Sequence, residues 1–300
     1  MKAITSFSEL TSHLKNLNSR KRIAVVNALD SHTLDAVLRA VDAGIAEAYL
    51  LGDAETIKSL LGKNISPHVH IIDIPNVQTA TLEAVRMVKE GEADILMKGL
   101  VNTDVILRAI LDKEKGLLPA GNVMTYNAAL QIPTYHKLLF FTDPAVIPYP
   151  DIRQRKAMIN YCIQTANKFG VEQPKIALIH ATEKPSPKLH YMNDYLKIMQ
   201  CWRDGEFGNV IMDGPIDIFL ALDKERGGIK HIPTPVLGNA DIVIFPNFES
   251  ANVFYKGVTT FGGAQMGGIL QGTEKPVVMT SRGDSTESKF YSIAVSCILA

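Results

Sequence analysis

Short runs of β-branched and other apolar residues alternate along the chain with longer stretches in which apolar residues recur at helical spacing. Parallel strands must be joined by crossover segments, usually helices, so this alternation predicts βαβ units and a parallel sheet covered by helices. In such sheets, ligands bind at the loops that follow the carboxyl ends of the strands. The predicted strands are residues 22–28, 48–52, 70–74, 93–97, 175–181, 209–212, 240–245 and 276–280.

Three segments depart from this alternation. Residues 124–143 carry the sequence QIPTY between two apolar runs, which predicts a β-hairpin rather than a crossover. The proline-rich segment 142–150 follows, and proline disfavours both helix interiors and central strands, so we predict a domain boundary there. A second boundary is predicted in the glycine-rich segment 262–272.

Charge, cysteine content and hydropathy exclude several classes of protein. The 31 Lys and Arg residues balance 31 Asp and Glu residues, so the overall charge lacks the footprint of a nucleic-acid or anionic-membrane binder. Cys162, Cys201 and Cys297 are far apart, which argues against a disulfide framework and a thiolate metal cluster. No apolar run approaches the roughly 18 residues that span a bilayer. We expect a cytoplasmic protein.

One candidate anion site is the sequence TSRGDS at residues 280–285, between a predicted strand and an amphipathic helix. Such a junction offers free backbone N–H groups, a positive helix end and the Arg282 guanidinium, all of which suit a phosphate. The alternative is an ordinary helix cap with a surface arginine, and spacing alone does not decide between them. Asp284 and Glu287 have the spacing of a capping box.

Other strand ends carry polar residues too. Lys98 ends a predicted strand, and the helix that follows presents Arg108, so the two could bracket an anion; the alternative is a turn glycine with two solvated cations. Residues 237–247 form a predicted buried strand with polar side chains beyond its end, which is typical of a pocket wall or of a helix cap. Asp213 precedes Gly-Pro at a similar strand end, where a plain turn is the alternative.

Several catalytic motifs are absent from the sequence. Residues 267–272 have the glycine spacing of a phosphate loop, but Thr273 and Glu274 follow where Lys and Ser or Thr are required. No G-x-G-x-x-G opens a helix, and neither G-x-S-x-G nor H-E-x-x-H occurs. His68 and His70 have no evident further ligands. We therefore expect no metal site and no nucleotide site.

In this order, these segments resemble the phosphate acetyl/butyryltransferase family, and its butyryl branch more closely than its acetyl branch. The resemblance covers most of the chain and is densest over residues 238–292. It is carried by Met97-Lys98-Gly99, Thr103, Arg108, Thr142-Asp143, Pro174-Lys175, Glu183, Asp213-Gly214-Pro215, Phe245-Pro246, Asn252, Tyr255-Lys256, Gly272, Lys275-Pro276 and Ser281-Arg282. The continuation Glu287-Ser288-Lys289, with Ser292, is similar to the butyryl branch.

The chain departs from the family pattern at a few positions. Phe219 stands where an acid is usual, and Asn247 stands where Asp is common. Ser288 occupies the position at which acetyl enzymes have an Asp proposed to deprotonate the thiol. The resemblance therefore identifies no general base in this chain.

The resemblance implies two α/β domains with mostly parallel sheets flanked by helices, as in isocitrate and isopropylmalate dehydrogenases, with the active cleft between them. The domains would be residues 1–143 with 272–300, and residues 144–271. It also implies a homodimer or higher homo-oligomer without a prosthetic group. Coenzyme A and phosphate would be substrates.

The implied reaction converts a short-chain acyl-CoA, butyryl-CoA first, and phosphate into acyl phosphate and CoA by direct transfer in a ternary complex. Ser281 would stabilise developing negative charge, and Arg282 would clamp phosphate with its fork of donors. The residues implied to bind substrates are Lys98, Thr103, Arg108, Asp213, Asn252, Lys256 and Ser285.

Three alternatives stay open. The first is a phosphate acetyltransferase, since the sequence does not fix acyl chain length. The second is a metal-dependent decarboxylating dehydrogenase, which would need Asp ligands and a nucleotide pocket. The third is a non-catalytic sensor of CoA or acyl phosphate, which the departures at Phe219, Asn247 and Ser288 favour.

Overall fold

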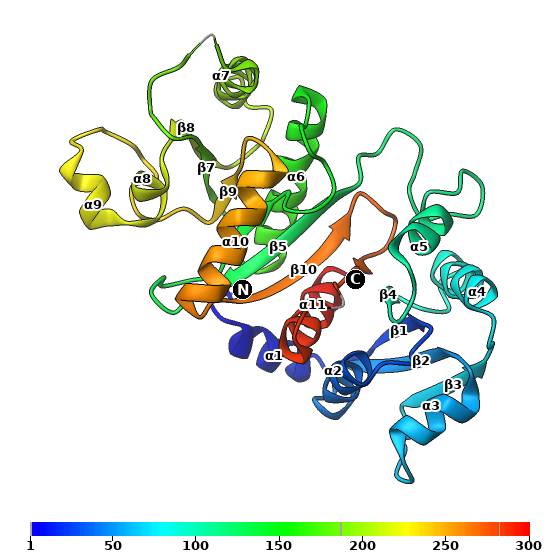
Figure 1. Ribbon diagram of the computed structural model, residues 1–300. Helices are drawn as coiled ribbons and strands as arrows, with labels where there is room; N and C mark the ends of the chain where they lie inside the picture. Colours follow the sequence, from blue (N-terminus) through cyan, green and yellow to red (C-terminus); the bar gives the residue numbers. More distant parts are fainter. Residues whose placement is uncertain (1, 187, 282) are drawn as a thin grey trace. The chain divides into compact units, whose positions relative to one another are not determined.

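The computed structural model describes residues 2–186, 188–281 and 283–300 (Figure 1). Arg282, which the resemblance implies as a phosphate ligand, lies outside the described residues. The chain forms two compact units. We call residues 7–124 with 266–300 the first unit, and residues 2–6 with 125–265 the second unit.

The sheet of the first unit is mostly parallel. Its strand order is β3, β2, β1, β4, β11, β10, and β10 pairs antiparallel with β11. The strands are β1 (Lys21–Val26), β2 (Ala46–Gly52), β3 (Val69–Asp73), β4 (Ile95–Lys98), β10 (Gln265–Gln271) and β11 (Val277–Val278). Parallel pairing brings the carboxyl ends of β1 and β4 together, with Val26 opposite Lys98.

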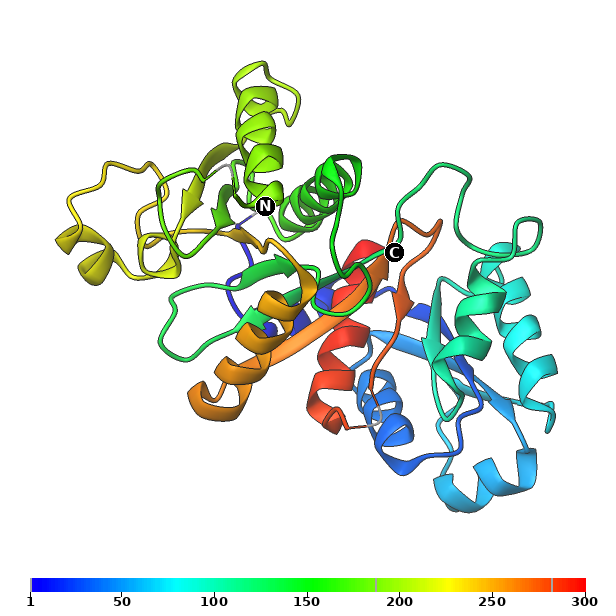
Figure 2. The same ribbon diagram turned by 45° about the horizontal axis from the view of Figure 1, so that its top comes forward.

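Helices cover this sheet in two groups. They are α1 (Phe7–Asn16), α2 (Ser31–Asp42), α3 (Ala54–Leu61), α4 (Val77–Lys89), α5 (Thr103–Ile110) and α11 (Thr286–Leu299). Figure 2 shows α11 beside α2 and, separately, α4 beside α5. The helix after β2 begins at the predicted cap, because the Asp53 carboxylate accepts the Thr56 amide.

The sequence did not predict β10, because its segment is rich in glycine, which weakens strands. The structure explains one of these glycines. A Cβ atom on Gly267 would lie 2.7 Å from the backbone carbon of Tyr291 in α11. The glycine therefore lets the C-terminal helix pack directly on the strand.

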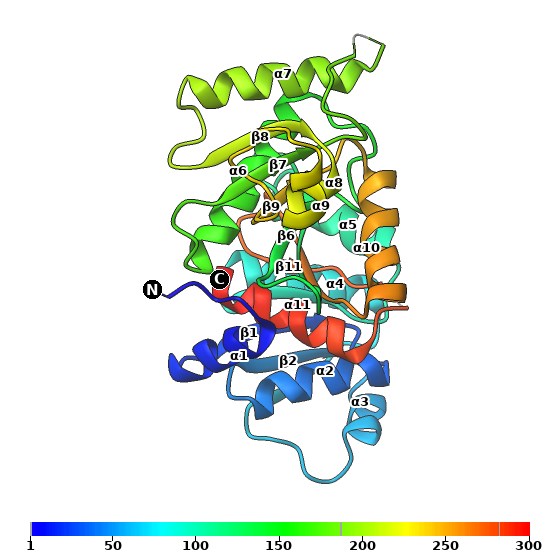
Figure 3. The same ribbon diagram turned by 90° about the vertical axis from the view of Figure 1, so that its left-hand side faces the viewer.

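The strands of the second unit are hydrogen-bonded in the order β5, β6, β9, β7, β8. Its strands are β5 (Thr125–Gln131), β6 (Leu139–Thr142), β7 (Lys175–Ile179), β8 (Ile211–Ile216) and β9 (Ile242–Ile244). The predicted hairpin is confirmed, since β5 and β6 pair antiparallel, and the other described pairs are parallel. Its helices are α6 (Ile152–Lys168), α7 (His190–Arg203), α8 (Ile218–Leu222), α9 (Lys224–Ile229) and α10 (Phe248–Gly262). Figure 3 shows α7 lying along β8.

The predicted α/β class, with mostly parallel strands flanked by helices, is confirmed. Each predicted strand range overlaps a strand of the structure, with ends that differ by a few residues. Among the residues that the structure describes, no helix is both long and apolar enough to cross a bilayer.

Candidate functional site

A small hollow of about 140 Å³ lies in the first unit, where β4 ends and α2 begins. We call it the lysine hollow. Its lining residues are Asp30, His32, Lys98, Gly99, Leu100, Thr280, Ser281 and Lys289. The sequence prediction placed ligands at strand ends, and this hollow occupies such a position.

Backbone contacts between two strand ends form one wall of the lysine hollow. The Gly99 amide donates to Val26 O at 3.0 Å, and the Leu100 amide donates to Asn27 O at 2.9 Å. A Cβ atom on Gly99 would lie 2.4 Å from Val26 O, so this close approach requires glycine. Asn27, at φ 51°, donates from its side chain to Leu100 O at 2.5 Å and fixes the turn.

Two buried lysines face the lysine hollow. Lys98 is 5% exposed and Lys289 is 4% exposed. The Lys98 ammonium donates to Gly99 O at 3.4 Å, and the Lys289 ammonium lies 3.9 Å from Asp30 Oδ1. Asp30 is thus the carboxylate nearest to the Lys289 ammonium among the described lining residues, and the distance is long. Because buried charge is unfavourable unless it is paired, this loose pairing of Lys289 favours a bound anion.

Ser281 brings a hydroxyl group to the same hollow. Its amide donates to Asp284 Oδ2 at 2.7 Å, and its Oγ accepts the Gly283 amide at 3.4 Å. The hydroxyl proton can therefore still be donated to a ligand. The predicted capping box of Asp284 and Glu287 is wrong, because the Asp284 carboxylate is engaged by Ser281 and the N-cap of α11 is Ser285.

Ser285 and Ser288 serve the start of α11. The Ser285 Oγ accepts the Ser288 amide at 3.1 Å and lies 3.3 Å from the Ser288 hydroxyl. Neither side chain is among the described lining of the lysine hollow. The role of Ser285 toward a substrate stays a prediction.

The structure does not bring Arg108 into the lysine hollow. Thr103 begins α5 at an exposed position, and the Arg108 side chain is 82% exposed and pairs with Asp104 at 3.3 Å. Neither Thr103 nor Arg108 is among the described lining residues. Their roles in binding substrate stay predictions.

The remaining predicted residues belong to the second unit. Asn252 and Lys256 lie one turn apart on α10, where Asn252 Nδ2 donates to Pro144 O at 2.9 Å and Lys256 is exposed. Asp213 lies on the edge strand β8 and accepts the Gly214 amide at 2.8 Å. Within the part of the chain that the structure describes, no hydrogen bond or ion pair joins Asp213 to Asn252 or Lys256.

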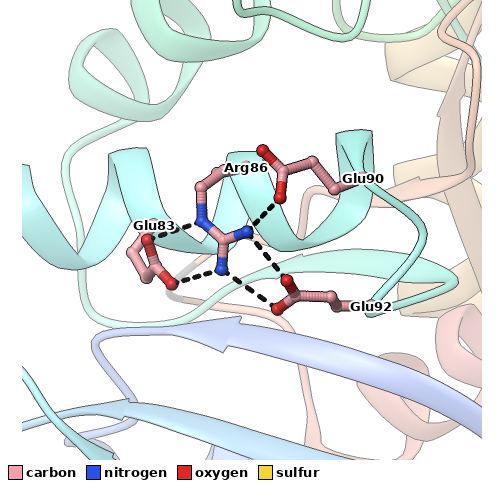
Figure 4. A network of polar contacts seen from close by, with 4 residues as sticks. All are labelled: Glu83, Arg86, Glu90 and Glu92. Atoms are coloured by element: carbon pink, nitrogen blue, oxygen red, sulfur yellow. Dashed lines mark hydrogen bonds and ion pairs between the residues drawn. The ribbon is translucent and has the colours of Figure 1, made fainter.

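A larger hollow of about 720 Å³ lies beside α4 and α5 in the first unit, and we call it the α4–α5 hollow. Its described lining is Ile74, Thr79, Leu82, Glu83, Val85, Arg86, Lys89, Glu90, Ala109, Asp112, Glu114 and Lys115. Arg86 donates to Glu83, Glu90 and Glu92, as Figure 4 shows. These hydrogen bonds raise the pKa of Arg86 further and lower the pKa values of Glu83 and Glu92.

All five N–H donors of Arg86 are used in this network, because Nε, Nη1 and Nη2 each donate to a carboxylate. The guanidinium therefore has no donor left for a ligand. The smaller lysine hollow is the stronger candidate for anion binding.

Three polar lining residues were not among the predicted site residues: Asp30, His32 and Lys289. Asp30 is the N-cap of α2, and its carboxylate accepts the Thr33 amide at 2.8 Å. For Lys289 a signal did exist, since this lysine occurs in a helix in which most other positions are apolar. Within the described ranges, no three His, Cys, Asp or Glu side chains gather as a metal site would require.

Comparison with known proteins places the chain in a family. Residues 73–297 match the family described as phosphate acetyl/butaryl transferase. The phosphate butyryltransferase of Clostridium acetobutylicum is 38% identical over 99% of both chains. The phosphate acetyltransferase of Thermotoga maritima is 35% identical over 93% of this chain and 95% of its own.

A solved structure agrees with these relatives. The branched-chain phosphotransacylase from Enterococcus faecalis superposes with a TM-score of 0.82 at 27% identity, over 93% of this chain and 98% of that chain. The resemblance found in the sequence is therefore confirmed. The chain belongs to the phosphate acetyl/butyryltransferase family and is a transferase.

Proposed function

We propose that the protein transfers a short acyl group, butyryl first, reversibly between coenzyme A and phosphate. The observation that carries this proposal is the lysine hollow, in which Ser281 and the buried Lys98 line one space of about 140 Å³. That space suits the phosphate substrate and is too small for a whole acyl-CoA. Acetyl transfer is the second candidate, because the Thermotoga maritima relative is named a phosphate acetyltransferase.

The proposed step is direct. A phosphate oxygen attacks the acyl carbon, the bond between that carbon and sulfur breaks, and the CoA thiolate leaves with the electron pair and then takes a proton. Lys98 neutralises phosphate charge, and Ser281 donates to the negative charge that develops on the carbonyl oxygen or the sulfur. In the reverse direction the CoA thiol, with a pKa near ~8.5, needs a cationic environment or a base to become a thiolate.

Direct transfer is favoured over an acyl-enzyme on Ser281. A serine nucleophile is activated by an adjacent base. Among the described residues, no hydrogen bond links the Ser281 hydroxyl to a histidine or a lysine. Arg282 is proposed to clamp phosphate beside Ser281, on the strength of the resemblance.

Several further points belong to this proposal and follow from the family. Besides the residues of the lysine hollow and Arg282, the residues proposed to bind substrates are Thr103, Arg108, Asp213, Asn252, Lys256 and Ser285. The functional domains are proposed to be residues 1–143 with 272–300, and residues 144–271, with a dehydrogenase-like cleft between them. We also propose a cytoplasmic homodimer without a prosthetic group, which light scattering and metal analysis would test.

The deciding experiment is a steady-state assay of CoA release from acyl-CoAs of increasing length, from acetyl to branched, with and without phosphate. We expect phosphate-dependent turnover that survives EDTA and is highest near butyryl-CoA. Zero turnover with every acyl-CoA would exclude the transferase and favour the non-catalytic sensor. Activity that requires NAD and Mg²⁺ would instead favour the metal-dependent decarboxylating dehydrogenase. Arg282→Lys should lose most activity while CoA still binds, since lysine lacks the bidentate fork.

A further inference from the structure

The lysine hollow contains a cation that the proposed function has not used. Lys289 lies near the start of α11, lines the hollow and is 4% exposed. A lysine is rarely buried unless its ammonium group is paired, because removing that charge from water is unfavourable. Its partners therefore indicate what the side chain does.

Those partners leave the Lys289 ammonium short of hydrogen bonds. Its Nζ lies 3.4 Å from Thr33 Oγ1 and 3.9 Å from Asp30 Oδ1, and the second distance is too long for a hydrogen bond. Asp30 Oδ1 already accepts the Thr33 amide at 2.8 Å. An ammonium group has three donors, and the described contacts engage one of them weakly.

A second lysine of this chain, which is half-buried, shows what full pairing looks like. Lys137, in the second unit, donates to Asp241 Oδ1 at 2.6 Å and to Asn239 O at 3.0 Å. Its side chain is 17% exposed, so it is less buried than Lys289 and yet better paired. The loose pairing of Lys289 is therefore a local property of the lysine hollow.

We propose that Lys289 is a phosphate-binding residue. Its ammonium donates to an oxygen of phosphate, or of the phosphoryl end of acyl phosphate, in the hollow that Lys98 and Ser281 also line. Asp30 holds the ammonium loosely when the hollow is empty. The identity of the anion rests on the proposed function. The opposing view is that Lys289 only fastens α11 to α2 through Asp30.

The test is the KM for phosphate, measured beside the KM for butyryl-CoA, in wild type, Lys289→Met, Lys289→Arg and the control Lys137→Met. Losing a charged hydrogen bond should raise the phosphate KM of Lys289→Met about 10- to 100-fold and that of butyryl-CoA less than about twofold. Lys289→Arg should recover part of the loss. The control should lower the unfolding midpoint and leave the phosphate KM unchanged.

A lower unfolding midpoint in Lys289→Met with an unchanged phosphate KM would overturn the proposal. Lys289 would then only hold α11 to α2 through Asp30. If Lys289→Met does not fold, Asp30→Asn replaces it as the test. The proposal expects this variant to bind phosphate more tightly than wild type, because the ammonium loses its competing carboxylate. If Lys289 only holds α11 to α2, Asp30→Asn should lower the unfolding midpoint and leave phosphate binding unchanged.

A second measurement separates this inference from the proposed function. Inorganic phosphate should raise the unfolding midpoint of wild type and not that of Lys289→Met, whether or not the protein turns over acyl-CoA. If wild type shows no turnover but does show this difference, the phosphate site stands and the transferase proposal falls. An equal rise in both proteins would remove Lys289 from the site even in an active enzyme.

Discussion

The two hollows of the first unit contain cations in opposite states of pairing. In the α4–α5 hollow, about 720 Å³ in volume, Arg86 gives all its N–H donors to three carboxylates. In the lysine hollow, about 140 Å³ in volume, Lys289 is almost completely buried, and its ammonium lies 3.9 Å from the Asp30 carboxylate.

In these two hollows, the pairing of the lining charges favours the smaller hollow as an anion site, although the other is larger. An exposed guanidinium saturated by carboxylates gains little from a ligand, because solvent and its neighbours already stabilise it. A buried ammonium with long contacts gains much more, because little else is available to stabilise it. We therefore expect substitutions in the lysine hollow to change catalysis and phosphate binding, and substitutions in the α4–α5 hollow to leave both unchanged.

The largest difference between the two hollows should be the effect on kcat of a substitution at Ser281. In Ser281→Ala we expect kcat to fall about 10² to 10³-fold with little change in CoA affinity, since the hydroxyl acts on charge present only in the transition state. Thr79→Ala, in the α4–α5 hollow, is the control and should leave kcat unchanged. Intact mass after mixing wild type with butyryl-CoA adds a second readout, and a stable acyl adduct on the protein would rule out direct transfer.

The second largest effect is expected from removing the charge of Lys98. Lys98→Met should raise the phosphate KM about 10- to 100-fold, because a buried charged hydrogen bond is lost. The matched control is Lys115→Met in the α4–α5 hollow, where we expect no effect on either KM. Equal effects of the two substitutions on the phosphate KM would show that the two hollows do not differ in phosphate binding.

A smaller effect is expected where the lysine hollow depends on a close backbone approach. Gly99→Ala would place a Cβ atom 2.4 Å from Val26 O, so we expect unfolding to become easier by about 1–3 kcal/mol, with loss of activity. Gly257→Ala is the control, because nothing lies within 4 Å of its added Cβ atom. Urea unfolding of the two variants checks this prediction. An unchanged midpoint for Gly99→Ala would mean that the ends of β1 and β4 can move apart without loss of stability.

The smallest effect should come from Arg86→Met, with kcat unchanged and an unfolding midpoint lower by about 2 °C or less at pH 7. Arg86 lowers the pKa values of Glu83 and Glu92 from 4.5, so the pairing stabilises the folded state above that pH. As the pH falls through the lowered values, these carboxyl groups take up protons and the difference from wild type should vanish. A difference that grows in acid would contradict this account of the network.

Much of the fold was predictable because the strand signals are local. Runs such as residues 22–28 and 240–245 are apolar enough to mark β1 and β9, and the turn at residues 131–135 marked the hairpin. The strand β10 was missed because Gly267 reflects packing against Tyr291, which no local pattern reveals. The cap of α11 was placed one residue early, because the Asp284 carboxylate is engaged by the Ser281 amide.

By itself, the sequence determined the α/β class, the family, and the candidates Ser281 and Lys98 at strand ends. It did so because apolar periodicity and the order of motifs are properties of the chain. Tertiary structure decided which of these residues share a hollow, because Asp30, Lys98, Ser281 and Lys289 come from four separate segments. It also decided which cations are already paired, as Arg86 is, and which are buried with long contacts, as Lys289 is. Pairing depends on distances between side chains that the parallel sheet brings together, and no spacing along the chain encodes those distances.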